Sequence, residues 1–467
     1  MKILFSNTFY QQRVEYTSLI SVVPPLDLAY CAALVRRRVA QADVSILDAN
    51  ALKLNLIDQV KRIKEFRPDI LIFTAATHSI NTVKYICQAL EGEKVKKILI
   101  GSHGSAFPKE TLMLISGLDI VVYGEPEITV LEIIQSLIEG NSLPSIRGIY
   151  HRYNNSILNT EPRPLLKDLD ELIFPARDLL PNQLYFSPYS KGVTAIQTTR
   201  GCPGQCIFCD SHLINGQSYR ERNPQKVVDE IEECLLKYKI KYFAIIDHTF
   251  TANRTFVEAV CNGIIKRNIH KMIHWACNTR VDMLSDELAL LMKRAGCIQV
   301  GIGIESAYNV GLNSLRKDIT EVQIKEAIQR LKRAGIIAMG YAIIGFPKDS
   351  LESIKETQKK IFNFNPHTLQ LSFATPLPGS ELYKYCLKEN RITSDNWDDF
   401  VFLRKSIILN DSISCEDLTA LRRNIIKKFY FRIPKIIELI YFFTFRVRLD
   451  YINCFKAGIK IALNIRK

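Results

Sequence analysis

The chain has 467 residues, of which 47% are hydrophobic, and a formal net charge of +14. This length exceeds one typical domain, so two or three domains with sizeable cores are expected. The charge excess is concentrated in residues 421–467, where twelve Lys or Arg stand against Glu438 and Asp450. Binding of nucleic acid by the whole protein is therefore not expected.

Twelve cysteines are scattered through the chain. In a small secreted protein they would suggest disulfides, but here residues 1–5 run straight into a strand-like segment without a signal peptide. A reducing, cytoplasmic location is the better interpretation. Six cysteines lie in apolar helical or strand patterns and are expected to be small core residues: Cys31, Cys87, Cys234, Cys261, Cys277 and Cys297.

Residues 1–140 alternate strand and helix patterns. Strands are predicted at residues 2–6, 44–48, 69–74, 97–101 and 120–123, and helices at 26–39, 56–66, 80–90, 108–116 and 128–139. This alternation predicts an α/β fold with a Rossmann-like, doubly wound parallel sheet. Ligands of such folds bind at the carboxyl ends of the strands. No Gly-x-Gly-x-x-Gly follows the first strand, so a dinucleotide site is not expected.

Residues 141–191 contain repeated prolines and little periodicity, which predicts a linker with one small hairpin. The alternation resumes in residues 192–395. Strands are predicted at 194–198, 242–247, 273–278, 298–304, 338–344 and 368–372, and helices at 224–237, 255–267, 286–295, 321–334 and 351–363. This pattern predicts a (βα)6 partial TIM barrel whose working face lies at the carboxyl ends of its strands.

Three cysteines follow the first predicted barrel strand at a Cys-x3-Cys-x2-Cys spacing: Cys202, Cys206 and Cys209. Thiolates are the preferred ligands of iron–sulfur clusters, and three of them would leave one iron open. Gly201, flanked by further Gly and Pro residues, allows the backbone to wrap tightly. The alternatives are unrelated core cysteines or a zinc knuckle with His212 as its fourth ligand.

Polar and glycine residues stand at the ends of the other barrel strands. Several such residues around one barrel mouth, beside a thiolate cluster, favour a site for a polar ligand. A lone charged residue at a strand end is more often only solvated or a helix cap. The candidates are Asp247, Asn278, Arg280, Gly301, Gly303, Glu305, Gly345 and Pro347.

The cysteine motif resembles that of the radical S-adenosylmethionine (SAM) superfamily, and Phe208 occupies the usual aromatic position before the third cysteine. The resemblance implies a 4Fe–4S cluster on the three cysteines, with its open iron binding SAM. Phe208 and the strand-end residues then become candidate cofactor-binding residues. Carboxylates suit the ammonium and hydroxyls of SAM, Arg280 suits its carboxylate, and glycines allow close approach to the adenosine.

Residues 1–140 resemble the cobalamin-binding domains fused upstream of radical SAM domains. The matching motifs are Pro-Pro-Leu-Asp-Leu-Ala-Tyr from residue 24, Leu-Asp-Ala-Asn from 47, Ile-Gly-Ser-His-Gly from 100 and Tyr-Gly-Glu-Pro-Glu from 123. The loop at residues 6–12 lacks the cobalt-ligating histidine of many cobalamin proteins, so cobalamin without a lower histidine ligand is expected. His78 and His103 are expected to be surface or hydrogen-bonded histidines. The alternative is that the fold persists without cofactor.

The combined resemblance, to class B radical SAM methyltransferases and anaerobic magnesium-protoporphyrin cyclases, implies cobalamin-dependent methylation of an unactivated carbon. It also implies a small-molecule or lipid-like substrate and an external electron donor of the flavodoxin or ferredoxin type. Radical cyclisation, rearrangement or oxidation without methyl transfer is the rival within the class. A non-catalytic cobalamin- or metal-binding regulator is the rival from another class.

Residues 396–467 predict a basic helical extension. Residues 427–435 are basic and aromatic, and the apolar run at 436–445 is too short to span a bilayer. One interpretation is a helix that caps the barrel with a solvated basic face. The other is peripheral docking on anionic lipid at the inner face of the membrane, with Phe442, Phe443 and Phe445 available for insertion.

Overall fold

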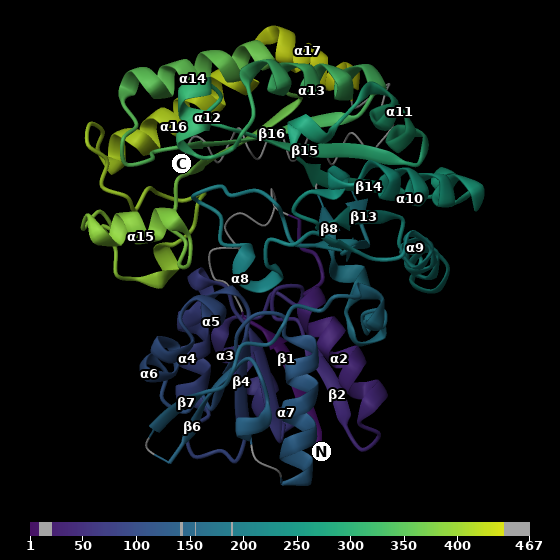
Figure 1. Cartoon of the computed structure of the whole chain (residues 1–467), viewed down its shortest axis with the longest axis vertical. Coiled ribbons are helices and arrows are strands. Elements are labelled where there is room, and N and C mark those ends of the chain that lie inside the picture. Colours follow the sequence, from purple (N-terminus) through teal and green to yellow (C-terminus); the bar gives the residue numbers. More distant parts are fainter. Residues whose placement is uncertain (9–20, 141–142, 155, 188–189, 443–467) are drawn as a thin grey trace.

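The computed structural model describes residues 1–8, 21–140, 143–154, 156–187 and 190–442. Two α/β units make up most of it, one at the bottom and one at the top of Figure 1. The lower unit contains a seven-stranded sheet, and the upper unit contains a six-stranded sheet. The α/β fold class predicted from the sequence is confirmed.

The first sheet has the strand order β2-β1-β3-β4-β5-β6-β7. Its parallel strands are short and almost wholly buried: β1 (Lys2–Asn7), β2 (Asp43–Leu47), β3 (Ile70–Thr74), β4 (Lys96–Ile100) and β5 (Ile120–Val122). The chain passes from β1 to β2 on one side and then returns to β3 on the other. Such a reversal of strand order creates a crevice at the carboxyl ends, which is the usual ligand site of open α/β sheets.

Helices cover both faces of this sheet, as the alternation predicted. They are α2 (Leu26–Arg38), α3 (Leu56–Phe66), α4 (Ile80–Ala89), α5 (Ser102–Ala106), α6 (Pro108–Leu114) and α7 (Glu127–Glu139). One core forms between the sheet and helices α2 and α7, and a second forms on the opposite face. Asn55 caps α3 by accepting a hydrogen bond from the backbone N–H of Asp58, which fixes where that helix begins.

The hairpin predicted within residues 141–191 is present, as β6 (Ile149–Tyr153) and β7 (Ser156–Asn159). It adds to the first sheet, because β6 pairs antiparallel with β5. The rest of this segment contains short 3₁₀ turns and the two-residue strands β8 (Phe186–Ser187) and β9 (Ser190–Lys191). The domain boundaries at residues 140, 191 and 395 stay predictions.

The second sheet is parallel and its strands follow sequence order, as a partial barrel requires. They are β10 (Val193–Ile196), β13 (Tyr242–Ile245), β14 (His274–Thr279), β15 (Cys297–Glu305), β16 (Ile337–Ile344) and β17 (Thr368–Phe373). The covering helices are α9 (Pro224–Tyr238), α10 (Arg254–Lys266), α11 (Asp286–Arg294), α13 (Glu321–Ala334) and α14 (Leu351–Phe364).

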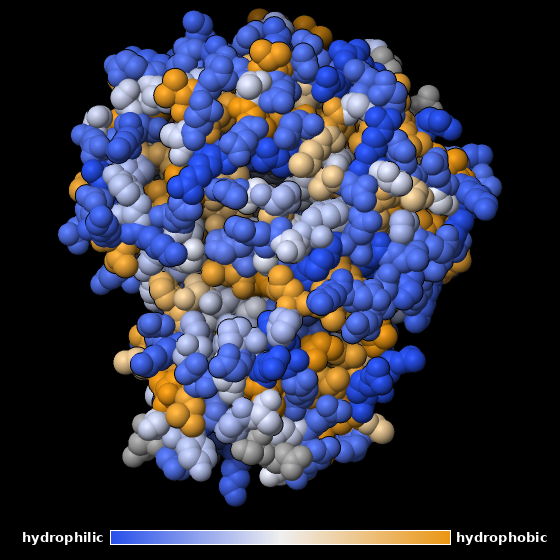
Figure 2. All heavy atoms as spheres, in the orientation of Figure 1, coloured by the Kyte–Doolittle hydropathy of each residue, from blue (hydrophilic) through white to orange (hydrophobic). Residues whose placement is uncertain are grey.

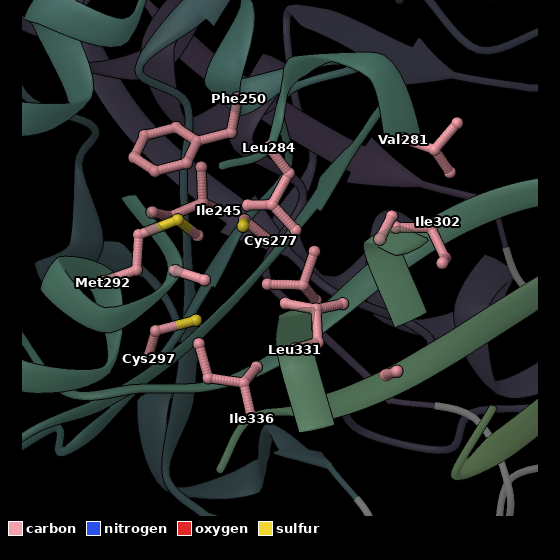
Figure 3. Close-up of a cluster of buried hydrophobic side chains, with 14 of the residues drawn as sticks. Ile245, Phe250, Cys277, Val281, Leu284, Met292, Cys297, Ile302, Leu331 and Ile336 are labelled. Carbon is pink, nitrogen blue, oxygen red and sulfur yellow. The ribbon is translucent and has the colours of Figure 1, made fainter. Parts of the chain in front are cut away.

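The barrel core lies between these strands and helices. Figure 3 shows part of it, where Phe250, Met292 and Leu331 pack with the sulfurs of Cys277 and Cys297. All six cysteines predicted to be core residues are buried and free. The short helices α8 (His212–Asn215) and α12 (Asn309–Ser314) were not predicted from the sequence.

The C-terminal segment contains α15 (Glu381–Lys388), α16 (Cys415–Tyr430) and α17 (Ile433–Tyr441). Helix α16 buries Leu418, Ile425 and Phe429 in the barrel core, so it caps the barrel. Phe442 is also buried, against the ring of His367, which makes its predicted availability for insertion wrong. Phe443 and Phe445 lie outside the described residues. No helix within the described part of the chain is long and apolar enough to cross a membrane.

Candidate active site

The three motif cysteines lie in the loop of residues 201–209, called the cluster loop here, after β10 and the short strand β11 (Thr199–Arg200). Gly201 opens it with φ +83°. A Cβ at Gly201 would stand 2.0 Å from the carbonyl oxygen of Ser218, so only glycine fits. All three cysteines are free and half-buried.

The thiols of the cluster loop face a small space left by Gly204. A Cβ there would lie 3.4 Å from Cys202 Sγ and 3.8 Å from Cys206 Sγ. Cys202 Sγ lies 3.6 Å from Thr249 Oγ1, and Cys209 Sγ lies 3.1 Å from Ser211 Oγ. Three free thiols in one loop, two of them beside a glycine, fit a 4Fe–4S cluster, whose ligands are cysteines.

Burial raises the pKa of Cys206, and the nearby Lys317 ammonium opposes that rise. Burial also raises the pKa of Cys209, and its hydrogen bond with Ser211 opposes that rise. A zinc knuckle needs several His, Cys, Asp or Glu side chains around one metal ion. No group of three such side chains among the described residues is arranged in this way. His212, the zinc ligand considered above, is exposed.

Asp247 does not point to an open site. Its carboxylate accepts a hydrogen bond from the backbone N–H of Thr198 at 2.7 Å and another from the Thr198 hydroxyl, and burial raises its pKa. Asp247 therefore fixes the chain just before the cluster loop. Phe208 packs inward as well, with its ring centroid 6.3 Å from that of Phe346.

Arg280 and Glu305 meet at the barrel mouth around Lys317, a residue that no sequence motif indicated. Lys317 Nζ donates to Glu305 Oε1 at 2.9 Å, and Arg280 donates to the Lys317 carbonyl at 3.0 Å. A Cβ at Gly303 would clash with both partners of the Glu305–Lys317 pair, so glycine makes room for this pair. A Cβ at Gly204 would also stand 3.7 Å from Arg280, which places the guanidinium beside the thiols.

Asn278 is exposed toward the barrel interior, where its side-chain oxygen accepts a hydrogen bond from the Tyr341 hydroxyl at 3.3 Å. A side chain at Gly301 would collide with both groups. Burial raises the pKa of Tyr341 to about 12. With the half-buried Gln299 and Gln370 on neighbouring strands, these residues give the interior a polar lining.

Gly345 and Pro347 have structural roles in the turn that follows β16. Gly345 has φ +86°, and its N–H and that of Phe346 donate to Asp349 at 2.8 and 3.0 Å. A Cβ at Gly345 would point at Leu418, 3.3 Å away. The glycine is thus explained by its turn and its packing, and an approach to adenosine stays a prediction. Pro347 accepts a hydrogen bond from the backbone of Asp411.

Small residues stand at the carboxyl edge of the first sheet. Thr74 ends β3 and Ala76 follows it, Gly101 and Ser102 follow β4, and all four are half-buried. Gly101 has φ +108°, and a Cβ there would strike the Ala75 carbonyl at 2.6 Å. A floor of small side chains at a reversal of strand order fits a large planar cofactor such as cobalamin.

His103 is buried between the rings of Phe107 and Trp397, with centroids 5.9 and 5.2 Å away. Its Nδ1 lies 3.3 Å from Thr77 Oγ1, and burial lowers its pKa to about 4. It is therefore a packed, hydrogen-bonded histidine. His78 is half-buried. Most of the loop at residues 6–12, from Phe9 onward, lies outside the described residues.

Comparison with known proteins identifies both units. Residues 196–361 match the model of the radical SAM superfamily, and residues 16–134 match that of the B12 binding domain. An uncharacterised methyltransferase of Pyrococcus horikoshii is 34% identical over 419 residues, which cover 89% of each chain. The anaerobic magnesium-protoporphyrin IX monomethyl ester cyclase of Rubrivivax gelatinosus is 32% identical over 77% of this chain and 66% of its own length.

The fold is also similar to that of the cobalamin-dependent SAM radical enzyme OxsB, solved with aqua-cobalamin and SAM bound. The TM-score is 0.73 at 16% identity, over 100% of this chain and 75% of that one. The three-cysteine loop, the two matched domains in this order and the 34% identity over nine-tenths of the sequence agree. The chain therefore belongs to the radical SAM superfamily, among its members with an N-terminal B12-binding domain.

Proposed function

We propose that this protein is a cobalamin-dependent radical SAM enzyme that transfers a methyl group to an unactivated carbon. The observation that carries the proposal is the cluster loop, with its three free thiols, placed at the mouth of the barrel. When bound, the reduced 4Fe–4S cluster supplies the electron that splits SAM into methionine and a 5′-deoxyadenosyl radical, and cobalamin supplies the methyl group.

The side chains of the barrel mouth divide this work. Cys202, Cys206 and Cys209 hold the cluster, and the cations Lys317 and Arg280 balance its negative charge. The acidic and amide groups that we predict to bind SAM are Glu305 and Asn278. Asp247 acts through the backbone of Thr198, as described above, and Phe208, Gly303, Gly345 and Pro347 shape the surroundings.

The substrate side of the proposal rests on the barrel interior. Tyr341, Gln299 and Gln370 offer hydroxyl and amide groups, whereas Ile246 and Met339 offer apolar surface. A small molecule with both polar and apolar parts suits such a lining. An external donor of the flavodoxin or ferredoxin type can approach at Pro203 and Gln205, which are the exposed residues of the cluster loop.

Anaerobic reconstitution with iron and sulfide tests the central claim. The reduced protein should cleave SAM to 5′-deoxyadenosine, and Cys206→Ala should abolish both the cleavage and the cluster spectrum. Cys415→Ala is the matched control, since Cys415 is another free, half-buried cysteine but lies on α16. Cleavage that survived replacement of all three motif cysteines would refute the proposal. A protein that bound cofactors but never cleaved SAM would be a regulator.

Radical cyclisation without methyl transfer is the second candidate, favoured by the similarity to the magnesium-protoporphyrin cyclase. The products separate the two. Methyl transfer consumes a second SAM and releases S-adenosylhomocysteine together with 5′-deoxyadenosine. Cyclisation releases 5′-deoxyadenosine alone. Screening fractions of cell extract for the two products at once would identify both the substrate and the reaction.

Cobalamin should bind without a histidine below the cobalt. The packing of His103 between two aromatic rings and its bond to Thr77 support this proposal. The cob(II)alamin form should then show no nitrogen superhyperfine splitting from an axial imidazole in its electron paramagnetic resonance (EPR) spectrum. Splitting that disappeared in His78→Ala or His103→Ala would contradict the assignment.

We also propose a cytoplasmic location with peripheral contact at an anionic membrane through α17. This helix exposes an apolar stripe, at one-helical-turn spacing: Ile433, Ile436, Ile437, Ile440 and Tyr441. Lys427 and Lys428 of α16 are exposed, whereas Lys435 is buried and donates to the Pro366 carbonyl. In Figure 2, hydrophobic residues reach the surface at the top of the molecule, where Figure 1 places α17.

An apolar stripe beside exposed lysines matches a lipid surface, where each basic residue is worth about 1 kcal/mol. Co-sedimentation with vesicles containing phosphatidylserine should therefore fall with salt. Ile433→Ser with Ile437→Ser should weaken it severalfold without unfolding the protein, because both side chains are more than 60% exposed. Binding that is equal on neutral and anionic vesicles, or unchanged in the double variant, would exclude this surface.

A further inference from the structure

Four charged side chains meet at the junction of the two units. Arg200 stands two residues before Cys202, whereas Glu125 and Glu127 follow β5 of the first sheet. Arg200 Nη1 lies 3.1 Å from Glu125 Oε1, and its Nη2 lies 2.5 Å from Glu127 Oε1. Arg220 Nη1 lies 2.9 Å from the same Glu125 oxygen. All four side chains are at most 10% exposed.

The network is balanced and hydrogen-bonded, which a buried group of charges requires. Arg200 Nε donates to Gln197 at 3.0 Å, so its guanidinium fork has partners on three sides. Glu125 also accepts from the backbone N–H of Leu166 at 2.7 Å, and Arg220 donates to the Leu166 carbonyl at 2.6 Å. The network thus ties the first sheet, the connecting segment and the cluster loop to one another.

On the side of the cluster loop, Arg200 is held rigidly. Strand β11 pairs antiparallel with β12 (Arg220–Glu221), so Arg200 and Arg220 stand opposite each other. The next residue, Gly201, packs against Ser218 with no room for a side chain. A displacement of the Arg200 guanidinium would therefore move the backbone that leads directly to Cys202.

On the side of the first sheet, the same network reaches the carboxyl edge. Glu127 is the first residue of α7, and the carboxylate of Asp27 at the start of α2 lies near enough to interact with it electrostatically. Asp27 in turn accepts a hydrogen bond from the hydroxyl of Thr74, the last residue of β3. The ring of Tyr30 lies 6.0 Å from the Arg200 guanidinium. A series of neighbouring charged and polar groups therefore leads from the crevice to the cluster loop.

We propose that Arg200 is a positioning residue that holds the cluster loop and the carboxyl edge of the first sheet in one geometry, so that cofactor binding at the two places is coupled. The inference rests on the proposed function for the identity of the two cofactors. Coupling of two sites is reciprocal, because each ligand changes the affinity for the other by the same factor.

Arg200→Gln is the main test, because it keeps a polar side chain but removes the charge and the fork. Arg267→Gln is the matched control, since Arg267 also pairs with two carboxylates, Asp229 and Glu232, but wholly within the barrel unit. The dissociation constant of hydroxocobalamin is measured by absorbance for each protein, with and without a reconstituted cluster. The EPR spectrum of the reduced cluster is recorded with and without hydroxocobalamin.

In the wild type and in Arg267→Gln, the cluster should change the dissociation constant of hydroxocobalamin by about fivefold or more, a common size for coupled sites. Cobalamin should also alter the EPR spectrum. In Arg200→Gln both cofactors should still load, but the ratio of the two dissociation constants should fall to about one and the spectral change should vanish. Arg200→Lys should restore little, because an ammonium cannot bridge two carboxylates as a guanidinium does.

A second variant controls for loss of folding in Arg200→Gln. Arg200→Gln leaves the buried carboxylate of Glu127 without its cation, which can unfold the junction. The double variant Arg200→Gln with Glu127→Gln removes that imbalance and should fold, again with a ratio of about one. A wild-type ratio in a folded Arg200 variant, or a wild type without coupling, would overturn the inference. Cleavage of SAM by that same wild type would leave the proposed function standing.

Discussion

The burial of His103 predicts how stability depends on pH. The ring lies between Phe107 and Trp397, contacts Thr77 Oγ1 and is only 2% exposed. This burial lowers its pKa from 6.5 to about 4. The folded protein therefore holds His103 neutral at a pH where the unfolded chain would already protonate it.

The sign of the effect follows from proton linkage. The unfolded state binds more protons than the folded state between pH 6.5 and 4, so stability decreases as the pH falls through this range. His103 contributes its full stabilisation above pH 6.5. The two pKa values give a loss of about 1.4 kcal/mol at pH 5.5 and about 2.5 kcal/mol at pH 4.5. Below pH 4 the loss levels off at about 3.4 kcal/mol.

Urea unfolding at pH 7.5, 6.5, 5.5 and 4.5 measures this loss. The chain has two tryptophans, so Trp275→Phe leaves Trp397, which lies against His103, as the reporter. His103→Asn removes the titrating ring. As the pH falls, this variant should lose less stability than the parent, and the difference should equal the amounts given above. His212→Asn is the control, because His212 is exposed and should follow the parent. Parallel curves for the parent and His103→Asn would show that the ring titrates normally and would refute the reasoning.

Two other substitutions test local claims. Glu230→Gln should lower the free energy of unfolding by about 3–5 kcal/mol, because Glu230 is buried and pairs with both Arg177 and Arg222 at 2.5 and 2.6 Å. Glu258 pairs with Arg254 at the surface, so Glu258→Gln should change the free energy of unfolding by less than about 0.5 kcal/mol. Equal losses of stability in Glu230→Gln and Glu258→Gln would contradict the claim. Gly92 is the control for Gly201, because it has φ +82° but nothing within 4 Å of an added Cβ, and Gly92→Ala should cost roughly 1–2 kcal/mol of stability. Gly201→Ala should cost more than this, and only Gly201→Ala should lower iron binding.

Most of the regular structure could be predicted from the sequence, because long apolar periods persist through it. Helices α3 and α13 have the predicted bounds. The predicted strands of both sheets differ from the observed ones by only a few residues at their ends. Helices α5 and α8 were missed because they have five and four residues, too few for a helical period to be recognised. The pairing of β6 with β5 was missed because α7 separates the two strands in the sequence, and pairing between distant strands leaves no local signal.

The candidate site was predictable only in part. The cysteine spacing is a local pattern, so Cys202, Cys206 and Cys209 could be selected at once. Lys317 lies in a polar turn that resembles any exposed turn, and only the folded chain brings it within 2.9 Å of Glu305. Asp247 is the opposite case, because its strand-end position predicts a ligand, and the structure shows its carboxylate accepting hydrogen bonds from Thr198, so a contact with cofactor stays a prediction. The role of a strand-end carboxylate depends on which neighbouring N–H groups have no other acceptor.

Polar contacts accompany the apolar ones between the two units, and this has a physical consequence. Besides Arg200 and its carboxylates, the Tyr185 hydroxyl donates to Asp48 at 2.8 Å, and Asn81 donates to Asp398 at 3.0 Å. Apolar surfaces can slide over one another at little cost, whereas buried hydrogen bonds and ion pairs are satisfied in one arrangement only. Two cofactors on separate units can act on one substrate atom only if their separation is fixed. The directional contacts at this junction therefore suit the proposed chemistry, even though apolar contacts in their place would be at least as stable.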